Sequence, residues 1–245
     1  MTRTRIAIVN PNTTDSMTAS VVAAARPAAR PGTDLLGITA RFGVASIESH
    51  TDEVWGALAV LQEIERLEDS ATPPDAYVIA CFGDTGLPGA REAASGPVVG
   101  MTEAALMTAA LLAHRFSIIT MPRRTIEQSD RVVRTLGLGH RCTVRAVDEP
   151  VAEVHDGSAH LLGLFVTEAL RAIADDGAEA IVLGCAGLAD LVAPLQQRVG
   201  VPVIEGVSAA VALADGLLAQ NLTTSRSQTW ARSTSPRPAQ AGEHR

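Results

Sequence analysis

The amino-acid sequence predicts an α/β protein built from two similar lobes, each containing a parallel sheet. Short apolar runs rich in β-branched residues alternate with longer alanine- and leucine-rich segments of helical period. Apolar residues make up 47% of the chain and aromatic residues only 3%, which favours an aliphatic core of helices packed on parallel strands. Several segments also recur in the same order in both halves, and 245 residues suffice for two lobes.

The elements follow one another in the order that βα units require. Eight short apolar runs predict strands, at residues 4–9, 34–38, 76–80, 97–100, 116–120, 143–147, 179–184 and 201–204. Six longer segments with apolar residues at helical spacing predict helices, at residues 14–26, 51–68, 102–114, 125–136, 158–176 and 207–220. Crossover helices of this kind connect parallel strands.

An internal repeat relates the two halves of the chain. IAIVNPNTT at 6–14 matches SIITMPRRT at 117–125, and GPVVGMTEAA at 96–105 matches VPVIEGVSAA at 201–210. Cys81 and Cys185 occupy corresponding places in the two halves. The repeat predicts two lobes of common ancestry, related by a pseudo-twofold axis that brings equivalent loops face to face.

The repeat also predicts where the lobes begin and end. Residues 1–98 form the N-terminal lobe, which helix 207–220 rejoins, and residues 99–206 form the C-terminal lobe. Residues 221–245 are rich in Ser, Thr, Arg and Pro and have no apolar period. They are predicted to be a disordered tail.

Charge and hydropathy exclude several classes of partner. The net charge is −7 and the chain shows no basic stripe for phosphate neutralisation, which argues against nucleic acid. The apolar run at the N-terminus is too short for a signal peptide, and no run approaches a membrane span. Three cysteines do not make a disulfide framework in a chain of this length. A soluble cytoplasmic protein with free thiols is expected.

The sequence argues against two kinds of cofactor. All 20 basic residues are arginine, so no lysine is present to hold pyridoxal phosphate as a Schiff base. The chain contains neither H-E-x-x-H nor C-x-x-C, the common spacings of zinc ligands. Neither a metal nor an organic cofactor is expected.

Two cysteines follow predicted strands and are the candidate chemical groups. Cys81 lies in VIACFGDTG and Cys185 in IVLGCAGLAD, each followed by small residues that let backbone N–H groups point at the site. Ligands of open α/β sheets bind outside the carboxyl ends of the strands, so a cleft between the lobes would have one thiol on each wall. One sulfur as thiolate and the other as thiol would move a proton from one face of a carbon acid to the other. The alternative is that both are inert core cysteines, which is the interpretation favoured for Cys142.

The motifs around the two cysteines resemble a known family. IVNPNT, SIESHTDE, ACFGDTGL, PVVGMTEAA, VLGCAGLADL and PVIEGVSAA together resemble the hydantoin racemase family, including allantoin racemases, within the aspartate/glutamate racemase superfamily. The resemblance extends from about residue 4 to residue 220. It implies two flavodoxin-like lobes with the site in their cleft, usually in a homo-oligomer. It also implies a cofactor-independent racemase of 5-substituted hydantoins in which Cys81 and Cys185 are the acid and base.

The resemblance also implies a set of residues that bind the small-molecule substrate. They are Asn12, Val44, Ile47, Phe82, Gly83, Thr120, Ala186 and Gly187. Among them, the two glycines can offer backbone amides to hydantoin carbonyls, or can simply form turns. Asn12 faces the substrate or, with Asn10, caps the turn and the following helix. Val44 and Ile47 are pocket walls or ordinary core.

Some questions stay open at the level of sequence. Arg123 and Arg124 either bind an anionic or ureido substituent of the substrate or start a solvated helix. Glu48 and His50 either line the cleft or hold its loop. A different reaction of the superfamily, such as amino-acid racemisation, maleate isomerisation or arylmalonate decarboxylation, would use the same fold. A non-catalytic module that binds a small molecule is the alternative outside enzymes.

Overall fold

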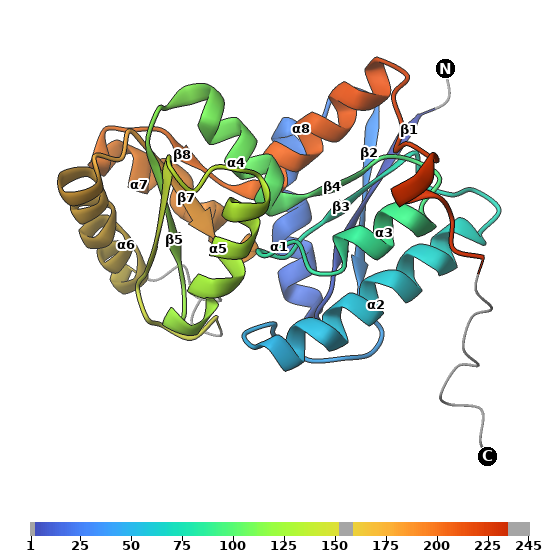
Figure 1. The fold of residues 1–245 in the computed structure, drawn as a ribbon, viewed down its shortest axis with the longest axis horizontal. Coiled ribbons are helices and arrows are strands. Elements are labelled where there is room, and N and C mark those ends of the chain that lie inside the picture. Colours follow the sequence, from blue (N-terminus) through green and yellow to red (C-terminus); the bar gives the residue numbers. More distant parts are fainter. Residues whose placement is uncertain (1–2, 152–158, 235–245) are drawn as a thin grey trace.

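The computed structural model describes residues 3–151 and 159–234 and contains two four-stranded parallel sheets (Figure 1). The first sheet has the order β2-β1-β3-β4 and the second the order β6-β5-β7-β8. The strands are β1 (Thr4–Asn10), β2 (Thr33–Thr39), β3 (Ala76–Ile79), β4 (Val98–Gly100), β5 (Phe116–Thr120), β6 (Cys142–Ala146), β7 (Ala180–Gly184) and β8 (Val203–Ile204). The predicted two-lobed α/β fold is confirmed, and each predicted strand lies within two residues of the observed one.

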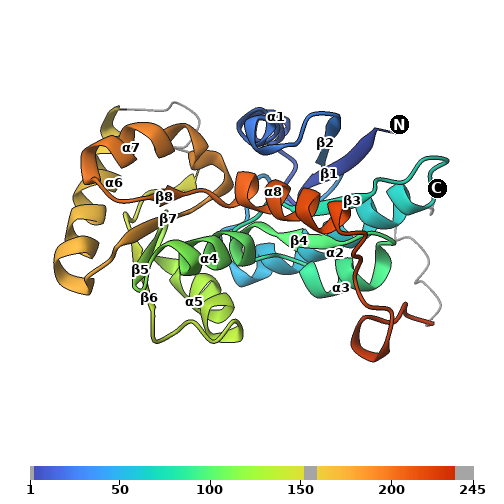
Figure 2. The same ribbon diagram turned by 90° about the horizontal axis from the view of Figure 1, so that it is seen from above.

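Helices cover both faces of each sheet. They are α1 (Asp15–Ala25), α2 (His50–Glu68), α3 (Leu87–Ala93), α4 (Met101–Leu112), α5 (Ile126–Thr135), α6 (Ala159–Arg171), α7 (Val192–Val199) and α8 (Gly206–Ala219). In the first lobe α1 and α8 pack on one face and α2 and α3 on the other (Figure 2). In the second lobe α6 and α7 pack on one face, and α4 and α5 on the other.

Two short helices, α3 and α7, were not predicted from the sequence. Each has only two turns or so, and each carries a proline in its first turn, Pro88 and Pro194. Proline is tolerated there because the first N–H groups of a helix have no partner within the helix. With so few residues, neither segment shows enough apolar period to be recognised.

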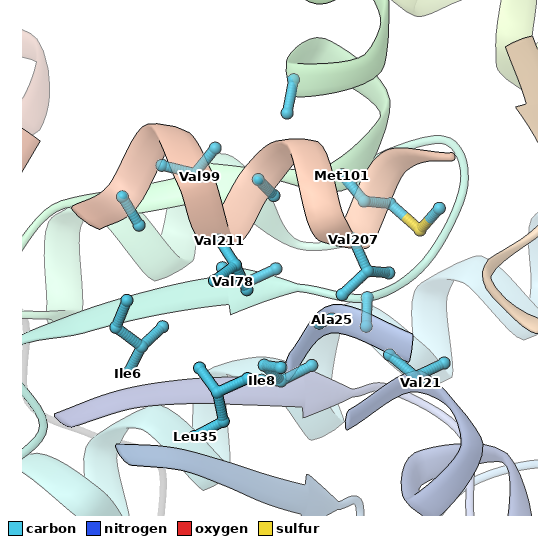
Figure 3. Packing of buried hydrophobic residues seen from close by; sticks show 14 of the residues in the cluster. Ile6, Ile8, Val21, Ala25, Leu35, Val78, Val99, Met101, Val207 and Val211 are labelled. Carbon is cyan, nitrogen blue, oxygen red and sulfur yellow. The ribbon is translucent and has the colours of Figure 1, made fainter. Parts of the chain in front are cut away.

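Helices α4 and α8 connect the lobes in opposite directions. Helix α4 follows β4 of the first sheet and packs on the second, whereas α8 follows β8 of the second sheet and packs on the first. Val207 and Val211 of α8 lie in one buried cluster with Ile8 and Val78 of the first sheet (Figure 3). The lobe boundary predicted at residue 98 falls inside β4, which continues to Gly100.

The predicted disordered tail makes defined contacts in its described part. Residues 221–234 include a short 3-10 turn, Gln228–Trp230, while residues 235–245 of the predicted tail lie outside the described residues. The guanidinium of Arg226 donates to the backbone carbonyl oxygens of Arg91 and Ala94, at the carboxyl end of α3. These carbonyls have no partner within the helix, so the arginine supplies one. The cation of Arg91 in turn lies 5.7 Å from the ring of Trp230.

None of the helices in residues 3–151 and 159–234 is both long and apolar enough to cross a membrane.

Candidate active site

The two candidate cysteines line one cavity between the sheets. Cys81 follows β3 closely and Cys185 follows β7 directly, at the carboxyl ends of equivalent inner strands. The cavity has an empty volume of about 510 Å³, part of it open to solvent, and residues of both lobes line it. Its position at the carboxyl ends of the strands is where open α/β sheets bind ligands.

The strand that leads to Cys185 requires a glycine at its last position. A Cβ atom on Gly184 would lie 2.8 Å from the Cα atom of Thr120 on the neighbouring strand β5. This close approach lets the hydroxyl of Thr120 donate to the carbonyl oxygen of Gly184, at 3.3 Å. The contact holds the end of β7 against Thr120 of β5, so that Cys185 lies next to Thr120 in the lining of the cavity.

The sulfur of Cys185 lies at the start of the 3-10 helix Ala186–Leu191. The backbone N–H groups of Ala186 and Gly187 point at the sulfur and favour its ionised form. Burial acts in the opposite direction and is the larger effect, and the charge of Glu48 adds to it. The pKa of the Cys185 thiol is raised to about 11.

The sulfur of Cys81 has a different donor. The hydroxyl of Thr85 donates to it at 3.3 Å and favours the thiolate. Burial is again the larger effect and, together with the charges of Cys185, Asp84 and Glu53, raises the pKa of the Cys81 thiol to about 12. The influence of Cys185 shows that the two sulfurs are within electrostatic reach of each other.

The sequence predicts that backbone N–H groups point at the cysteines and favour a thiolate. In the structure the amides of Ala186 and Gly187 do point at Cys185, but burial outweighs them. Burial therefore favours the thiol form of both sulfurs.

A buried carboxyl group fixes the loop that follows Cys81. Asp84 has a positive φ of 54° and is 8% exposed. Its carboxylate accepts from the N–H groups of Thr102 at 2.8 Å and Glu103 at 2.9 Å, in the first turn of α4. Burial, and next the charge of Glu103, raise the pKa of Asp84 to about 7 despite these two bonds. Helix α4 begins after Gly100, which has no capping side chain, so Asp84 caps it from the cysteine loop.

Five of the eight predicted substrate-binding residues line the cavity together with both cysteines. These are Asn12, Ile47, Phe82, Thr120 and Ala186. The other three, Val44, Gly83 and Gly187, are not part of the cavity lining.

Each of those three has a backbone group engaged elsewhere. The carbonyl oxygen of Val44 accepts from the N–H of Thr13 at 3.0 Å, and Ser46 lines the cavity near it. The N–H of Gly83 donates to the hydroxyl of Thr102 at 2.7 Å, so it is not free for a substrate carbonyl as expected. The N–H of Gly187 is directed at the sulfur of Cys185.

Asn12 holds the turn before α1 and also lines the cavity. Its Oδ1 atom accepts from the N–H of Thr14 at 3.0 Å and from the side chain of Asn10 at 2.8 Å, which fixes the turn before α1. Its Nδ2 atom lies 3.2 Å from the sulfur of Met17, and both residues line the cavity. The amide nitrogen thus takes no part in the turn and contacts Met17 instead.

The arginine pair lies outside the cavity. Arg123 and Arg124 are both exposed, and Arg123 pairs with Asp148, with 3.7 Å between Nε and Oδ2. His50 is also exposed, and its Nδ1 atom lies 3.6 Å from Oε2 of Glu53. The carboxylate of Glu48 accepts a hydrogen bond of 2.9 Å from the hydroxyl of Ser46. Of these residues, Glu48 influences the site through its charge on Cys185 and by holding the loop that carries Ser46.

Sequence reasoning missed several residues of the cavity, above all Gln128 and Ser129 of α5. The internal repeat held a signal for them, because 6–14 and 117–125 lead into α1 and α5, and the same spacing pairs Met17 with Gln128. Both Met17 and Gln128 line the cavity.

The wall of the cavity is neutral. Among the described residues that line it there is no Asp, Glu, Arg or His side chain. No group of three or more His, Cys, Asp or Glu side chains in residues 3–151 and 159–234 is placed to hold a metal ion. The arrangement presents two thiols, hydroxyls, carboxamides and apolar side chains to a small neutral ligand.

Comparison with known proteins identifies the family. A model of the Asp/Glu/Hydantoin racemase family matches residues 6–214. A hydantoin racemase from Rhizobium meliloti is 42% identical over 227 residues, which cover 92% of this chain and 93% of the relative.

Two solved structures are similar over nearly the whole chain. An allantoin racemase from Klebsiella pneumoniae has a TM-score of 0.92 and 41% identity, covering 96% of both chains. An allantoin racemase from Pseudomonas fluorescens has a TM-score of 0.91 and 38% identity, covering 96% of this chain and 99% of the other. The resemblance noted from the motifs is confirmed, and the chain belongs to the Asp/Glu/hydantoin racemase family of isomerases.

Proposed function

We propose that this protein is a two-base racemase that inverts C5 of 5-substituted hydantoins, with allantoin among its candidate substrates. The observation that carries the proposal is the pair of equivalent cysteines, Cys81 and Cys185, which come from different lobes and line one cavity. The names of its relatives, hydantoin racemase and allantoin racemase, support the substrate class.

The proposed reaction moves protons between the two sulfurs and the ring. The thiolate of one cysteine removes the C5 proton, so an S–H bond forms and the C5–H bond breaks. The electron pair of that bond moves onto the adjacent carbonyl oxygen and gives an enolate. The opposite thiol then donates its proton to the other face of C5, so that the two sulfurs have exchanged roles. The ring carbonyl stores the charge, so the reaction consumes no cofactor; a placed acid or base contributes roughly 10²–10⁴-fold in rate.

The neutral cavity favours a hydantoin over the substrates of related reactions. Cationic side chains are the strongest partners of the carboxylates of an amino acid or a dicarboxylate, and the described lining offers none. Arg123 and Arg124, the cations nearest in sequence, are exposed on the outer surface. A neutral ring with amide groups matches the hydroxyl and carboxamide groups that are present.

Hydrogen exchange with solvent tests the proposal directly. A single enantiomer of allantoin or of a 5-alkylhydantoin is incubated with the enzyme in deuterated water, while optical rotation and deuterium at C5 are followed together. Rotation should be lost as deuterium enters C5. A non-catalytic binding module would change neither quantity, and this outcome would exclude the racemase.

Serine variants of the cysteines test the assignment of the two bases. Cys81→Ser and Cys185→Ser should each lower racemisation at least 10³-fold, because the hydroxyl is a far weaker acid than the thiol. Each variant should retain exchange without inversion for the enantiomer whose C5 proton faces the remaining sulfur. Cys142→Ser is the matched control, since Cys142 lies at the start of β6 and does not line the cavity. Normal racemisation by both single variants would refute the two-base mechanism.

We further propose that the enzyme is a cytoplasmic homo-oligomer. Helices α4 and α8 pack together and expose large apolar side chains, namely Met107, Leu111, Leu112 and Leu213. Exposed apolar side chains of this size are typical of subunit interfaces, which supports a homo-oligomer. The cytoplasm is a reducing compartment, which keeps thiols free, and this supports the proposed location. Sedimentation of the wild type should give a mass above 25.5 kDa, and Leu111→Asp should lower it.

A further inference from the structure

Gln128 lies in the first turn of α5, where the chain leaves β5 at the edge of the cavity. Its side chain is only 5% exposed and lines the same cavity as Cys81 and Cys185. The Cβ atom of Gln128 lies 3.6 Å from the position that a Cβ would take on Gly83, so it borders the loop that follows Cys81. A polar side chain buried to this degree normally has a hydrogen-bond partner.

The other polar side chains of the described lining do have partners. On the same lobe, Thr120 and Thr125 share a hydrogen bond of 2.8 Å, and Ser129 donates to the carbonyl oxygen of Thr125 at 3.3 Å. On the opposite lobe, Ser46 donates to Glu48 and Asn12 accepts from Thr14.

The carboxamide of Gln128 has no such partner among the described residues. Within residues 3–151 and 159–234, no completely buried side-chain nitrogen or oxygen lacks a hydrogen bond. The amide atoms of Gln128 therefore keep their small remaining exposure, and the cavity is the space that this side chain borders.

The chemistry of a carboxamide narrows what it can bind. It offers two N–H donors and one carbonyl acceptor side by side, and it carries no charge. A ligand group that has an N–H next to a C=O, such as an amide or a urea, satisfies donor and acceptor together. The equivalent position of the first lobe holds Met17, which is apolar. The cavity is therefore polar at Gln128 and apolar at Met17, and this difference can orient a bound ring.

We propose that Gln128 is a specificity-determining residue that pairs its carboxamide with an amide or urea group of the substrate. This assignment rests on the proposed hydantoin racemase function. The N–H and C=O can belong to the hydantoin ring itself or to a ureido group at C5. In both cases the pairing fills the free hydrogen-bonding positions of Gln128.

The test is Gln128→Met, which keeps the length of the side chain and reproduces the residue of the other lobe. Racemisation is measured with allantoin, which carries a ureido group, and with 5-isobutylhydantoin, which does not. We expect kcat/KM for allantoin to fall about 10- to 100-fold, because a lost hydrogen bond leaves the substrate group unpaired. An equal fall for 5-isobutylhydantoin identifies the ring as the partner, and a fall confined to allantoin identifies the ureido group.

Controls keep the result decisive. Gln62→Met makes the same change on α2, away from the cavity, and should leave both substrates within twofold of the wild type. Gln128→Ala removes the same carboxamide without adding bulk and serves if the first variant unfolds. A fall of less than threefold on both substrates by a folded variant refutes the role of Gln128. A wild type that racemises neither substrate refutes the proposed function instead.

Discussion

At the scale of single residues, the two catalytic candidates differ in what stabilises their ionised form. Two backbone N–H groups, from Ala186 and Gly187, point at the sulfur of Cys185, whereas one hydroxyl, from Thr85, donates to Cys81. Burial raises the pKa of both thiols, to about 11 for Cys185 and about 12 for Cys81. From the two amide donors we expect Cys185 to ionise first as the pH rises.

This order predicts a pH-dependent pattern of alkylation in the free enzyme. The thiolate is the reactive species, and its fraction rises about tenfold per pH unit below the pKa. Between pH 7 and 10 the rate of modification by iodoacetamide should therefore rise with pH, and Cys185 should react ahead of Cys81. The measurement is mass spectrometry of peptides after timed alkylation. A rate that stays constant from pH 6 to 9 would show that a thiolate already exists at neutral pH.

At the scale of elements, the two lobes cap corresponding helices in different ways. After the last strand of the first sheet, the N–H groups of Thr102 and Glu103 at the start of α4 donate to Asp84, from the loop after Cys81. After the last strand of the second sheet, the matching N–H groups of Val207 and Ser208 donate to Glu205, which directly precedes α8. Only the first arrangement connects a helix cap to a cysteine loop.

Removal of each cap should therefore have a different effect on activity. Asp84→Ala leaves two buried N–H groups unpaired and should lower the free energy of unfolding by about 2–4 kcal/mol. Because it also releases the Cys81 loop, kcat should fall at least tenfold. Glu205→Ala should cost about 1–2 kcal/mol, as for other N-caps, with kcat within threefold of the wild type. Urea denaturation and steady-state kinetics on the same samples provide both quantities, and equal losses of kcat would contradict the link.

At the scale of the whole molecule, one ion pair spans the two lobes beside the cavity. Arg131 of α5 donates to both carboxylate oxygens of Glu53 on α2, and Glu53 is mostly buried. The charge of Glu53 also raises the pKa of Cys81. The pair thus holds the lobes together and partly neutralises a charge that acts on the site.

Loss of this pair should weaken substrate binding more than folding. Arg131→Gln should raise KM by up to about 5-fold, since a partly exposed ion pair contributes about 1 kcal/mol or less. The difference from the wild type should shrink in 0.5 M salt, because exposed charges are screened. Arg134→Gln is the matched control, as Arg134 lies on the same helix and pairs within it, with Glu127 and Asp130. The same rise of KM in both variants would argue against a specific inter-lobe contact.

Local patterns of the sequence were enough to predict the strands and the places of the two cysteines. A buried parallel strand needs an unbroken apolar run, such as AIVLG before Cys185, and such runs are visible without any tertiary contact. The internal repeat predicted that corresponding residues of the two halves come together. The short helices α3 and α7 were missed because two turns with a proline show little periodicity.

The sequence by itself determined the α/β class, the duplicated lobes and the two thiols that follow equivalent strands. Only the tertiary structure decided which neighbours those thiols have. In the structure the N–H of Gly83 donates to Thr102, Arg123 lies on the surface, and Gln128 lines the cavity. The physical reason is that strand periodicity is a local property of the chain, whereas burial, free hydrogen-bonding groups and pKa values depend on atoms supplied by distant segments.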